Sequence, residues 1–267
     1  MIGVEILGRL GNQMFQFAFA RIESNKLSTD YFLLETNKLY IQKYFEIDFD
    51  RFKNTLKSFR FRLFHYFNKQ ILTENQQESP VSELARFGAD NTIYKGFYQS
   101  AQYFEGFEKE VKALFKIRKV YSVDIRKTMT KTQKPLLAVH VRLTDYKDFG
   151  YQNRTLSKQY YTHCFERLKN LEDYEVWILS DDIGEAKLFF SDYADFHFAE
   201  NTPLMTDFQI MQQADALIVA NSSFSWWAAY LSEAKMIFAP QYWLGVFEKK
   251  EQPCGISENL HWQWIDS

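Results

Sequence analysis

The chain of 267 residues contains little glycine, proline or cysteine. Its 10 glycines and 5 prolines are too few for a fibrous or low-complexity protein. Its two cysteines, Cys164 and Cys254, match neither a metal-ligand spacing nor a disulfide framework. The sequence therefore predicts a globular protein of a reducing compartment.

The chain also lacks a charge excess and a long apolar run. Its 32 basic and 34 acidic residues give a formal net charge of −2, whereas nucleic-acid-binding proteins usually carry a basic excess. No apolar run approaches the roughly 18 residues of a membrane span. Met1 leads directly into an apolar strand rather than a signal peptide. We therefore expect a cytoplasmic protein with no nucleic-acid partner.

Hydrophobic residues make up 46% of the chain, which is enough for a sizeable core. In the second half, short apolar runs alternate with helix-like segments, which predicts a parallel sheet covered by helices on both faces. The expected strands are 135–141, 175–180, 195–199, 216–220 and 235–240. The expected helices are 158–170, 183–190, 204–214 and 224–233.

The first half is less regular. It contains three expected strands (3–7, 31–35 and 92–97), a helix from about residue 14 to 26 and a surface loop over 73–83. Two α/β lobes joined near residues 118–134 are the simplest architecture, with a first lobe of residues 1–130 and a second of residues 131–267. We expect a cleft between these lobes.

Residues 51–69 form an expected amphipathic helix. Aromatic and leucine side chains recur at helical spacing, and the other faces carry arginine and lysine with no acid. The recurring apolar residues are Phe52, Leu56, Phe59, Leu63 and Phe67. One interpretation is docking on the anionic inner face of a membrane. The alternative is a solvated basic face over a buried phenylalanine stripe.

Polar residues follow three of the expected strands in the second lobe. They are His140 and Arg142, then Ser180, Asp181 and Asp182, then Asn221, Ser222 and Ser223. Ligands of parallel α/β sheets bind beyond the carboxyl ends of the strands. Three polar strand ends on one edge therefore predict a binding site.

The segment "HVRLTDY" (140–146) places His140 and Arg142 on the same side of a strand end. Arginine offers a permanent charge and a planar fork that suits phosphate oxygens. The alternative is a structural histidine with an Arg–Asp ion pair, in which Asp145 of the following loop is the acid.

The segment "NSSFSWW" (221–227) follows an expected strand and begins an expected helix. Serine hydroxyls and the amides of a helix N-terminus can cradle a diphosphate. An N-cap explains one serine but not the whole group. We expect Trp226 and Trp227 to lie in the core or the wall of a cleft.

The stretch "LGRLGNQMFQF" (7–17) resembles neither a dinucleotide fingerprint nor a P-loop. Two glycines three residues apart let a backbone approach a ligand closely. The alternative is a tight turn capped by Asn12. In "LSDD" (179–182), two acids could bind metal only with further ligands, which the sequence does not identify. One of them could instead cap a helix, or accept hydrogen bonds from a ribose or guanine.

Four segments in this order, "GRLGNQMFQFAFA", "GFYQSAQYF", "HVRLTDY" and "NSSFSWWAAYL", resemble the bacterial α-1,2-fucosyltransferases of glycosyltransferase family 11. The resemblance implies a GT-B-type fold of two Rossmann-like lobes, with an acceptor-side first lobe and a donor-binding second lobe. It implies inverting transfer of L-fucose from GDP-fucose to the 2-hydroxyl of a glycan ending in galactose, without metal or cofactor.

The resemblance also assigns roles to residues. His140 and Arg142 match the first and third positions of the family's His-x-Arg-Arg-x-Asp motif, where this arginine is expected to hold the β-phosphate. Asp145 matches the final acid and is the candidate general base, or it orients Arg142. The other expected substrate contacts are Gly11, Asn12, Gln13, Asp181 (to guanine), Asn221, Ser222, Ser223 and Phe224, with Asn12 also assigned to catalysis.

One departure from the motif concerns its second arginine, which is Leu143 here. Strand alternation points Leu143 away from His140 and Arg142, so we expect it to pack inside the lobe. The departure keeps two other functions open, transfer of a different GDP-sugar and binding without turnover. The acceptor could be a lipid-linked glycan.

Overall fold

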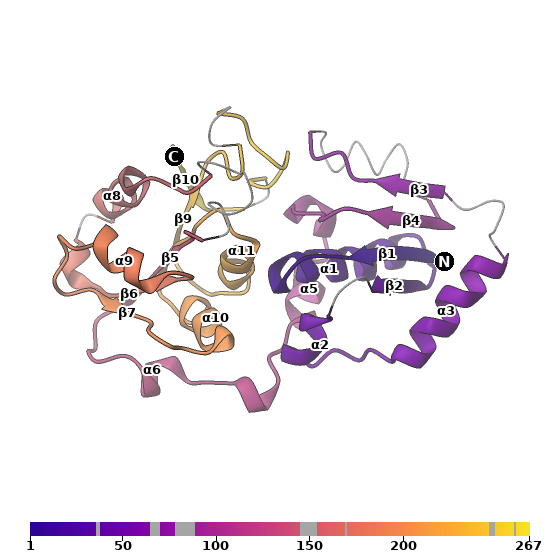
Figure 1. The fold of residues 1–267 in the computed structure, drawn as a ribbon, viewed down its shortest axis with the longest axis horizontal. Coiled ribbons are helices and arrows are strands. Elements are labelled where there is room, and N and C mark those ends of the chain that lie inside the picture. The colour runs from indigo at the N-terminus through magenta and orange to yellow at the C-terminus, as the bar shows by residue number, and fades with distance from the viewer. Residues whose placement is uncertain are drawn as a thin grey trace. The chain divides into compact units, whose positions relative to one another are not determined.

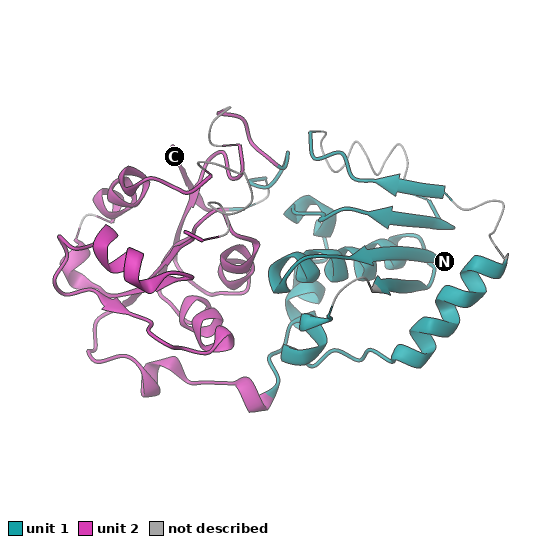
Figure 2. Cartoon of the chain, in the orientation of Figure 1, with its two compact units in different colours: residues 1–118, 253–260 teal, residues 119–252, 261–267 magenta. Residues whose placement is uncertain are grey.

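The computed structural model describes residues 1–35, 38–64, 70–77, 89–144, 154–168, 170–245, 249–258 and 260–267. Its elements are labelled in Figure 1. The chain forms two compact units, residues 1–118 with 253–260 and residues 119–252 with 261–267 (Figure 2). Each unit contains a sheet of parallel strands with helices packed against it, as expected for an α/β protein.

The described part of the first unit contains four strands in the order β2-β1-β4-β3. They are β1 (Ile2–Ile6), β2 (Tyr31–Glu35), β3 (Gln70–Thr73) and β4 (Thr92–Lys95). Val4 of β1 pairs with Leu33 of β2 and Tyr94 of β4. Alternate residues of β1 (Ile2, Val4 and Ile6) are completely buried, as expected for a strand with one face on the core.

The helices in the described part of this unit are α1 (Leu10–Lys26), α2 (Tyr40–Tyr44), α3 (Arg51–Phe64), η1 (Ala101–Phe104) and α5 (Glu108–Leu114). α1 begins four residues before the expected start, since the turn after β1 is shorter than predicted. β3 lies between the expected helix and loop and was not predicted. It is a four-residue edge strand with mostly exposed side chains, so it carries no apolar alternation.

Among its described residues, the second unit contains six parallel strands in the order β10-β9-β8-β5-β6-β7. They are β5 (Leu136–Val141), β6 (Glu175–Ser180), β7 (His197–Phe198), β8 (Ala216–Ile218), β9 (Met236–Pro240) and β10 (Gln263–Ile265). Ala138 of β5 pairs with Trp177 of β6 and Leu217 of β8. All six residues of β5 are buried, because this strand has neighbours on both edges and helices on both faces.

The expected strands and helices of this unit are confirmed, with ends shifted by a few residues. The helices are α8 (Lys158–Arg167), α9 (Ile183–Phe189), α10 (Leu204–Gln212) and α11 (Ser223–Tyr230), with short turns η2 (Lys119–Tyr121), α6 (Ile125–Thr128) and η3 (Leu171–Asp173). β10 was not predicted, since its three residues follow an irregular segment. No described helix is both long enough and apolar enough to cross a membrane.

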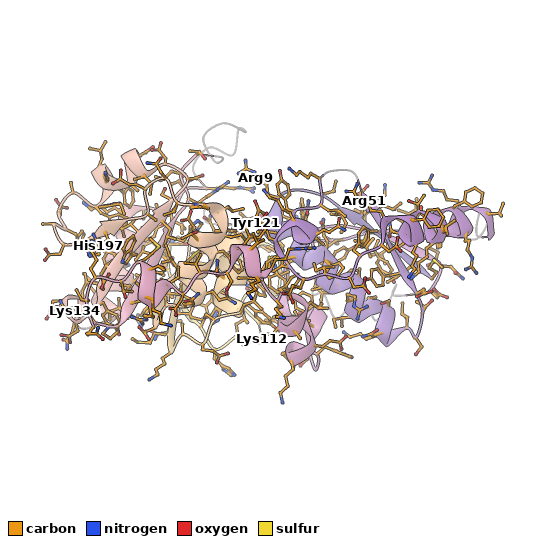
Figure 3. The ribbon with its side chains drawn as sticks, turned by 90° about the horizontal axis from the view of Figure 1, so that it is seen from below. Arg9, Arg51, Lys112, Tyr121, Lys134 and His197 are labelled. Atoms are coloured by element: carbon orange, nitrogen blue, oxygen red, sulfur yellow. The ribbon has the colours of Figure 1, made fainter. Side chains whose placement is uncertain are left out.

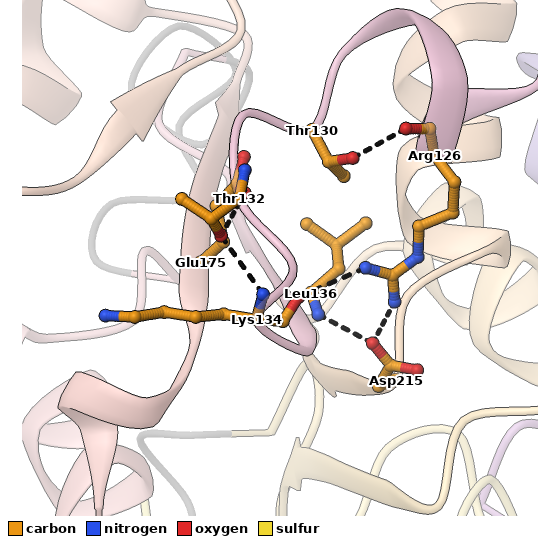
Figure 4. Close-up of polar contacts among 7 residues, drawn as sticks. All are labelled: Arg126, Thr130, Thr132, Lys134, Leu136, Glu175 and Asp215. Carbon is orange, nitrogen blue, oxygen red and sulfur yellow. Dashed lines mark hydrogen bonds and ion pairs between the residues drawn. The ribbon is translucent and has the colours of Figure 1, made fainter.

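Residues 119–135 belong to the second unit, so the division precedes Lys119 instead of following residue 130. Side-chain hydrogen bonds explain this placement (Figure 4). Arg126 contacts Asp215, whose Oδ2 also accepts from the Leu136 amide at 2.6 Å. Glu175 Oε2 accepts from the amide and the hydroxyl of Thr132, at 2.8 and 2.7 Å.

Near the other end, residues 253–260 return to the first unit. The Cys254 amide donates to the Gln76 carbonyl at 2.9 Å, and the Ser100 hydroxyl donates to the Gly255 carbonyl at 2.6 Å. These partners lie far apart in the sequence, which is why composition and spacing did not reveal the return.

In each sheet, strands are added on both sides of the first strand. In the first unit the chain goes from β1 to β2 and later places β4 on the other side of β1. In the second unit it goes from β5 to β6 and β7 and later places β8 on the other side of β5. Such switch points, at the carboxyl ends of the strands, are where α/β sheets bind ligands.

Candidate functional site

The switch point of the second unit brings together two of the predicted segments. His140 is near the carboxyl end of β5 and Arg142 directly follows it, whereas Phe224 lies in the first turn of α11 after β8. The ring centroids of His140 and Phe224 are 6.1 Å apart. The ends of β5 and β8 therefore lie side by side, as the strand-end pattern predicted, and binding of a ligand there stays a prediction.

Arg142 is held by Asp181, which follows the neighbouring strand β6. The Arg142 Nη1 atom lies 3.1 Å from Asp181 Oδ2, and the two side chains are only 17% and 18% exposed. Asp181 also accepts from the amides of Leu143 (2.8 Å) and Thr144 (3.2 Å), and from the Thr144 hydroxyl. It fixes both the guanidinium and the turn after β5.

These contacts keep Asp181 ionised. Burial alone would raise its pKa, but the hydrogen bonds from Thr144 and Leu143 and the charge of Arg142 lower it below its ordinary value. The guanine contact expected of Asp181 stays a prediction. In this structure its carboxylate is already engaged by the β5 turn.

His140 is a neutral imidazole at pH 7. Burial and the adjacent Arg142 charge lower its pKa to about 4, although Asp181 opposes the shift. Its side chain is 5% exposed, and Nδ1 has no hydrogen-bond partner within the described ranges. A neutral imidazole can present either a donor or an acceptor to a ligand, so His140 suits a polar but uncharged group beside the arginine.

The N-terminus of α11 supplies main-chain amides to this site. Ser222 is the N-cap residue and makes no side-chain capping bond, and the first helical bond runs from the Trp226 amide to the Ser222 carbonyl at 2.9 Å. Ser222 and Ser223 are partly exposed. A helix N-terminus of this kind favours anions.

Other residues of the same turn are internal. Asn221 is 1% exposed, and its Nδ2 donates to the carbonyls of Arg154 (2.8 Å) and Trp243 (3.2 Å). Ser225 is fully buried and donates to the Ala220 carbonyl at 3.2 Å. Asn221 therefore joins the turn to neighbouring loops, and its contact with substrate stays a prediction.

Leu143 and the two tryptophans pack in the core as expected. Leu143 is 1% exposed and belongs to the same buried cluster as Val141 and Leu156. Trp226 and Trp227 are completely buried. A leucine at the motif's second arginine position thus extends the core and leaves Arg142 in place.

The two acids after β6 have separate roles. Asp182 caps α9, accepting from the Glu185 amide at 3.0 Å, so the expected helix cap is confirmed for this residue. No group of three His, Cys, Asp or Glu side chains suited to a metal ion occurs in the described part of the chain. Asp145 lies outside the described residues, and its role as base or as partner of Arg142 stays a prediction.

The turn between β1 and α1 (residues 7–9) lies at the switch point of the first unit. Gly8 has a φ of +72°, and a Cβ there would come within 2.5 Å of Asn12 Nδ2, so only glycine fits. The N-cap of α1 is Arg9 without a side-chain capping bond, so capping by Asn12 is wrong. Instead, Asn12 Oδ1 accepts from Gln99 Nε2 at 2.8 Å.

Gly11, Asn12 and Gln13 all lie in the first turn of α1, and Gly11 and Gln13 are buried. Gln13 Nε2 donates to the carbonyls of Gly8 (3.2 Å) and Lys38 (2.7 Å), and its Oε1 accepts from the Tyr40 amide at 2.7 Å. Gln13 therefore holds the turn and the following loop together. Contacts of these residues with substrate stay predictions.

The sequence did not predict a role for two residues of these turns. Thr144 binds Asp181 across neighbouring strands, which spacing alone cannot show. Arg9 is an exposed cation at the N-cap of α1, where the first helical turn has no acid (Figure 3). The sequence could have indicated Arg9, because it is a cation placed between Gly8 and Gly11 in this turn.

The model of the family described as glycosyl transferase family 11 matches residues 1–253. An α-1,2-colitosyltransferase of Escherichia coli is 28% identical to the chain, over 95% of this chain and 96% of that protein. The O-antigen biosynthesis glycosyltransferase WbnK of Escherichia coli is 23% identical, over 88% and 92%.

Solved structures of fucosyltransferases have the same fold. The fucosyltransferase NodZ from Bradyrhizobium superposes with a TM-score of 0.53 at 11% identity, covering 86% of this chain and 93% of that chain. POFUT1 in complex with GDP superposes with a TM-score of 0.52 at 15% identity, covering 87% and 94%. The architecture of two α/β units is thus of the GT-B type found in fucosyltransferases.

Proposed function

Because the chain belongs to glycosyl transferase family 11, we propose that it transfers L-fucose from GDP-fucose to the 2-hydroxyl of a glycan, with inversion and without metal. The observation that carries this proposal is that β5, which Arg142 directly follows, ends at a switch point where His140 lies beside Phe224 in the first turn of α11. A permanent guanidinium charge and a helix N-terminus suit the two phosphates of a nucleotide-sugar donor.

The chemistry requires stabilisation of the leaving diphosphate. The acceptor oxygen forms a bond to the anomeric carbon while the bond from that carbon to the β-phosphate oxygen breaks, and negative charge develops on the departing GDP. Arg142 takes the β-phosphate, and Ser222, Ser223 and the α11 amides take the remaining phosphate oxygens. Preorganised donors of this kind stabilise developing charge strongly in a water-poor site.

The acceptor hydroxyl must lose a proton. Asp145 is the proposed general base, a role that typically contributes about 10²–10⁴-fold to the rate. Asn12 is proposed to contact the reacting groups, and His140 and Phe224 to contact the donor. POFUT1 binds GDP and NodZ is a fucosyltransferase, and the similarity to both supports a GDP-fucose donor.

A second candidate is transfer of another GDP-sugar to the same kind of hydroxyl. The observation that favours it is the similarity to an α-1,2-colitosyltransferase, whose name gives a different sugar with the same linkage. The similarity to an O-antigen biosynthesis glycosyltransferase supports a glycan acceptor, which could be lipid-linked, and a terminal galactose is our proposal for its end group.

The test is GDP release by the purified protein with EDTA present. GDP-fucose is compared with GDP-mannose, each with and without lactose as a galactose-ended acceptor. We expect lactose-stimulated release from GDP-fucose alone. Preference for another GDP-sugar would favour the second candidate. GDP binding without release from any donor would favour a binding protein, and loss of activity in EDTA would contradict the metal-free proposal.

A further inference from the structure

The exposed face of α3 carries an unusual combination of apolar and cationic side chains. Four large apolar residues, here called the apolar stripe, are 72%, 45%, 63% and 62% exposed: Phe52, Leu56, Phe59 and Leu63. Their exposure contradicts the interpretation of a basic face over a buried phenylalanine stripe, although Phe67 lies outside the described residues. A stripe this apolar on the surface indicates an interaction site.

The stripe lies opposite the side by which α3 is attached to the sheet. Successive residues of an α-helix are about 100° apart, so the four stripe residues fall within about 60° of one another and nearly opposite Phe61. Phe61 is 1% exposed and packs against Phe32 of β2, with ring centroids 5.1 Å apart. Asn54 fixes the same side through both backbone groups of Leu33, at 2.7 and 2.9 Å.

The attachment leaves α3 projecting from the sheet. A cavity of about 950 Å³ opens between the helix and the sheet. Phe59, at the edge of the stripe, and Arg62 border it together with Ile71 and Lys95 of the strands, among others. Ile71 is itself 56% exposed. Arg51, at the start of the helix, is likewise exposed (Figure 3).

Cations flank the stripe on both sides. Arg51 and Arg62 follow one edge, Lys53 and Arg60 follow the other by the same helical geometry, and all four are exposed. These four residues are called the flanking cations below. α3 contains no acidic residue. Asp50, which precedes it in the sequence, caps its first turn by accepting from the Phe52 amide at 2.9 Å, and Asp30 pairs with Lys57 on a side of the helix away from the stripe.

We propose that α3 docks this protein on an anionic membrane surface, with the apolar stripe inserted among the acyl chains and the flanking cations at the headgroups. Charge complementarity identifies the partner. An apolar stripe between two rows of cations, without acids, matches a layer that is apolar below and negative above. A protein partner would have to offer an apolar groove with two acidic rims.

The test is co-sedimentation of the full-length protein with vesicles of phosphatidylcholine, with and without 30% phosphatidylglycerol, at about 0.1 M salt. One variant replaces the apolar stripe (Phe52→Gln, Leu56→Gln, Phe59→Gln, Leu63→Gln). A second replaces the flanking cations (Arg51→Gln, Lys53→Gln, Arg60→Gln, Arg62→Gln). The matched charge control replaces four exposed lysines elsewhere: Lys109→Gln, Lys112→Gln, Lys119→Gln and Lys235→Gln.

We expect the wild type and the control to bind the anionic vesicles, and each α3 variant to bind at least about tenfold more weakly. Because all eight substituted side chains are exposed, circular dichroism and the thermal midpoint should stay unchanged. No binding by the wild type, equal binding to neutral vesicles, or equal binding by either α3 variant would overturn the proposal. A wild-type dimer that the stripe variant converts to monomer would assign the surface to a second copy of the chain instead.

Discussion

At the switch point of the first unit, two buried glutamines, Gln13 and Gln16, bond to the backbone, whereas at that of the second unit the ion-paired Arg142 stays partly exposed. Gln16 Oε1 accepts from the Leu7 amide at 2.9 Å and its Nε2 donates to the Gly96 carbonyl at 2.7 Å, joining the ends of β1 and β4. Arg142 instead reaches past the end of β5 beside Asp181. A parallel strand with neighbours added on both sides thus supports a scaffold in one unit and a charged site in the other.

The difference shows how an α/β sheet can divide two tasks. Where side chains satisfy main-chain groups at the strand ends, the turn becomes rigid and its substitution should affect folding. Where a strand end carries an ion pair next to a helix N-terminus, substitution should affect ligand binding. Four substitutions test this division.

The largest effect is expected for Arg142→Ala. The variant should bind GDP at least about 100-fold more weakly, because a charge-assisted bidentate contact to phosphate is lost. The free energy of unfolding should change little. Isothermal titration with GDP measures the effect, and Lys187→Ala, which removes a surface cation paired with Glu200, is the control. Unchanged affinity in Arg142→Ala would contradict the donor site.

The opposite pattern is expected for Gln16→Ala in the first unit. Gln16 is completely buried, and its loss leaves the Leu7 amide and the Gly96 carbonyl without partners. We expect the free energy of unfolding to fall by about 3 kcal/mol, measured by urea denaturation, with GDP affinity retained. Gln159→Ala on the exposed side of α8 is the control. A selective loss of GDP binding, with stability unchanged, would contradict the structural role of this switch point.

Much of the second sheet could be predicted from the sequence, because its strands are continuous apolar runs separated by helical periods. The short edge strand β3 and the three-residue β10 carry no such signal. The polar residues at strand ends were found by position alone. Their partners could not be found in this way. The contacts of Arg142 with Asp181 and of Gln16 with Gly96 depend on which strands are neighbours in the sheet.

α3 shows a related limit. Helical periodicity finds an apolar face but does not reveal whether that face meets the protein or the solvent. Phe61, which lies outside the recurring pattern, is the residue that packs against the sheet, while the expected stripe is exposed. Which face of α3 is buried depends on the side chains of β2 that pack against it, and the sequence alone does not show this pairing.

A third substitution compares the two ends of strand β6. Glu175 starts the strand, and although burial would raise its pKa, hydrogen bonds from Trp177, Thr132 and Lys131 lower it to about 2. Its stabilising contribution is therefore full above about pH 4.5 and is lost as the pH falls through about 2.

Glu175→Gln should accordingly lower the free energy of unfolding by roughly 2 kcal/mol at pH 7. Urea denaturation at pH 7, 4 and 3 should show the difference between wild type and variant shrinking with acidity, with GDP affinity at pH 7 unchanged. A difference that stays constant over this range would show that the charge of Glu175 is not what holds residues 131 and 132.

The smallest effect is expected for Asp181→Asn, just beyond the other end of β6. The carboxylate already accepts from the Leu143 amide, from the Thr144 amide and hydroxyl, and from Arg142. Because a carboxylate offers about four lone-pair sites, little capacity is left for a guanine edge. Asp181 should therefore act as a positioning residue for Arg142.

The asparagine variant keeps the size of the side chain but loses its charge and one acceptor. We expect affinities for GDP, UDP and inorganic pyrophosphate to fall together, by about three- to tenfold, because all three ligands depend on a well-oriented arginine. Isothermal titration with the three ligands separates this role from base recognition. Weaker binding of GDP alone, with UDP and pyrophosphate unaffected, would return Asp181 to the guanine contact that the family resemblance implies. It would also mean that GDP displaces part of the hydrogen bonding now seen at the turn after β5.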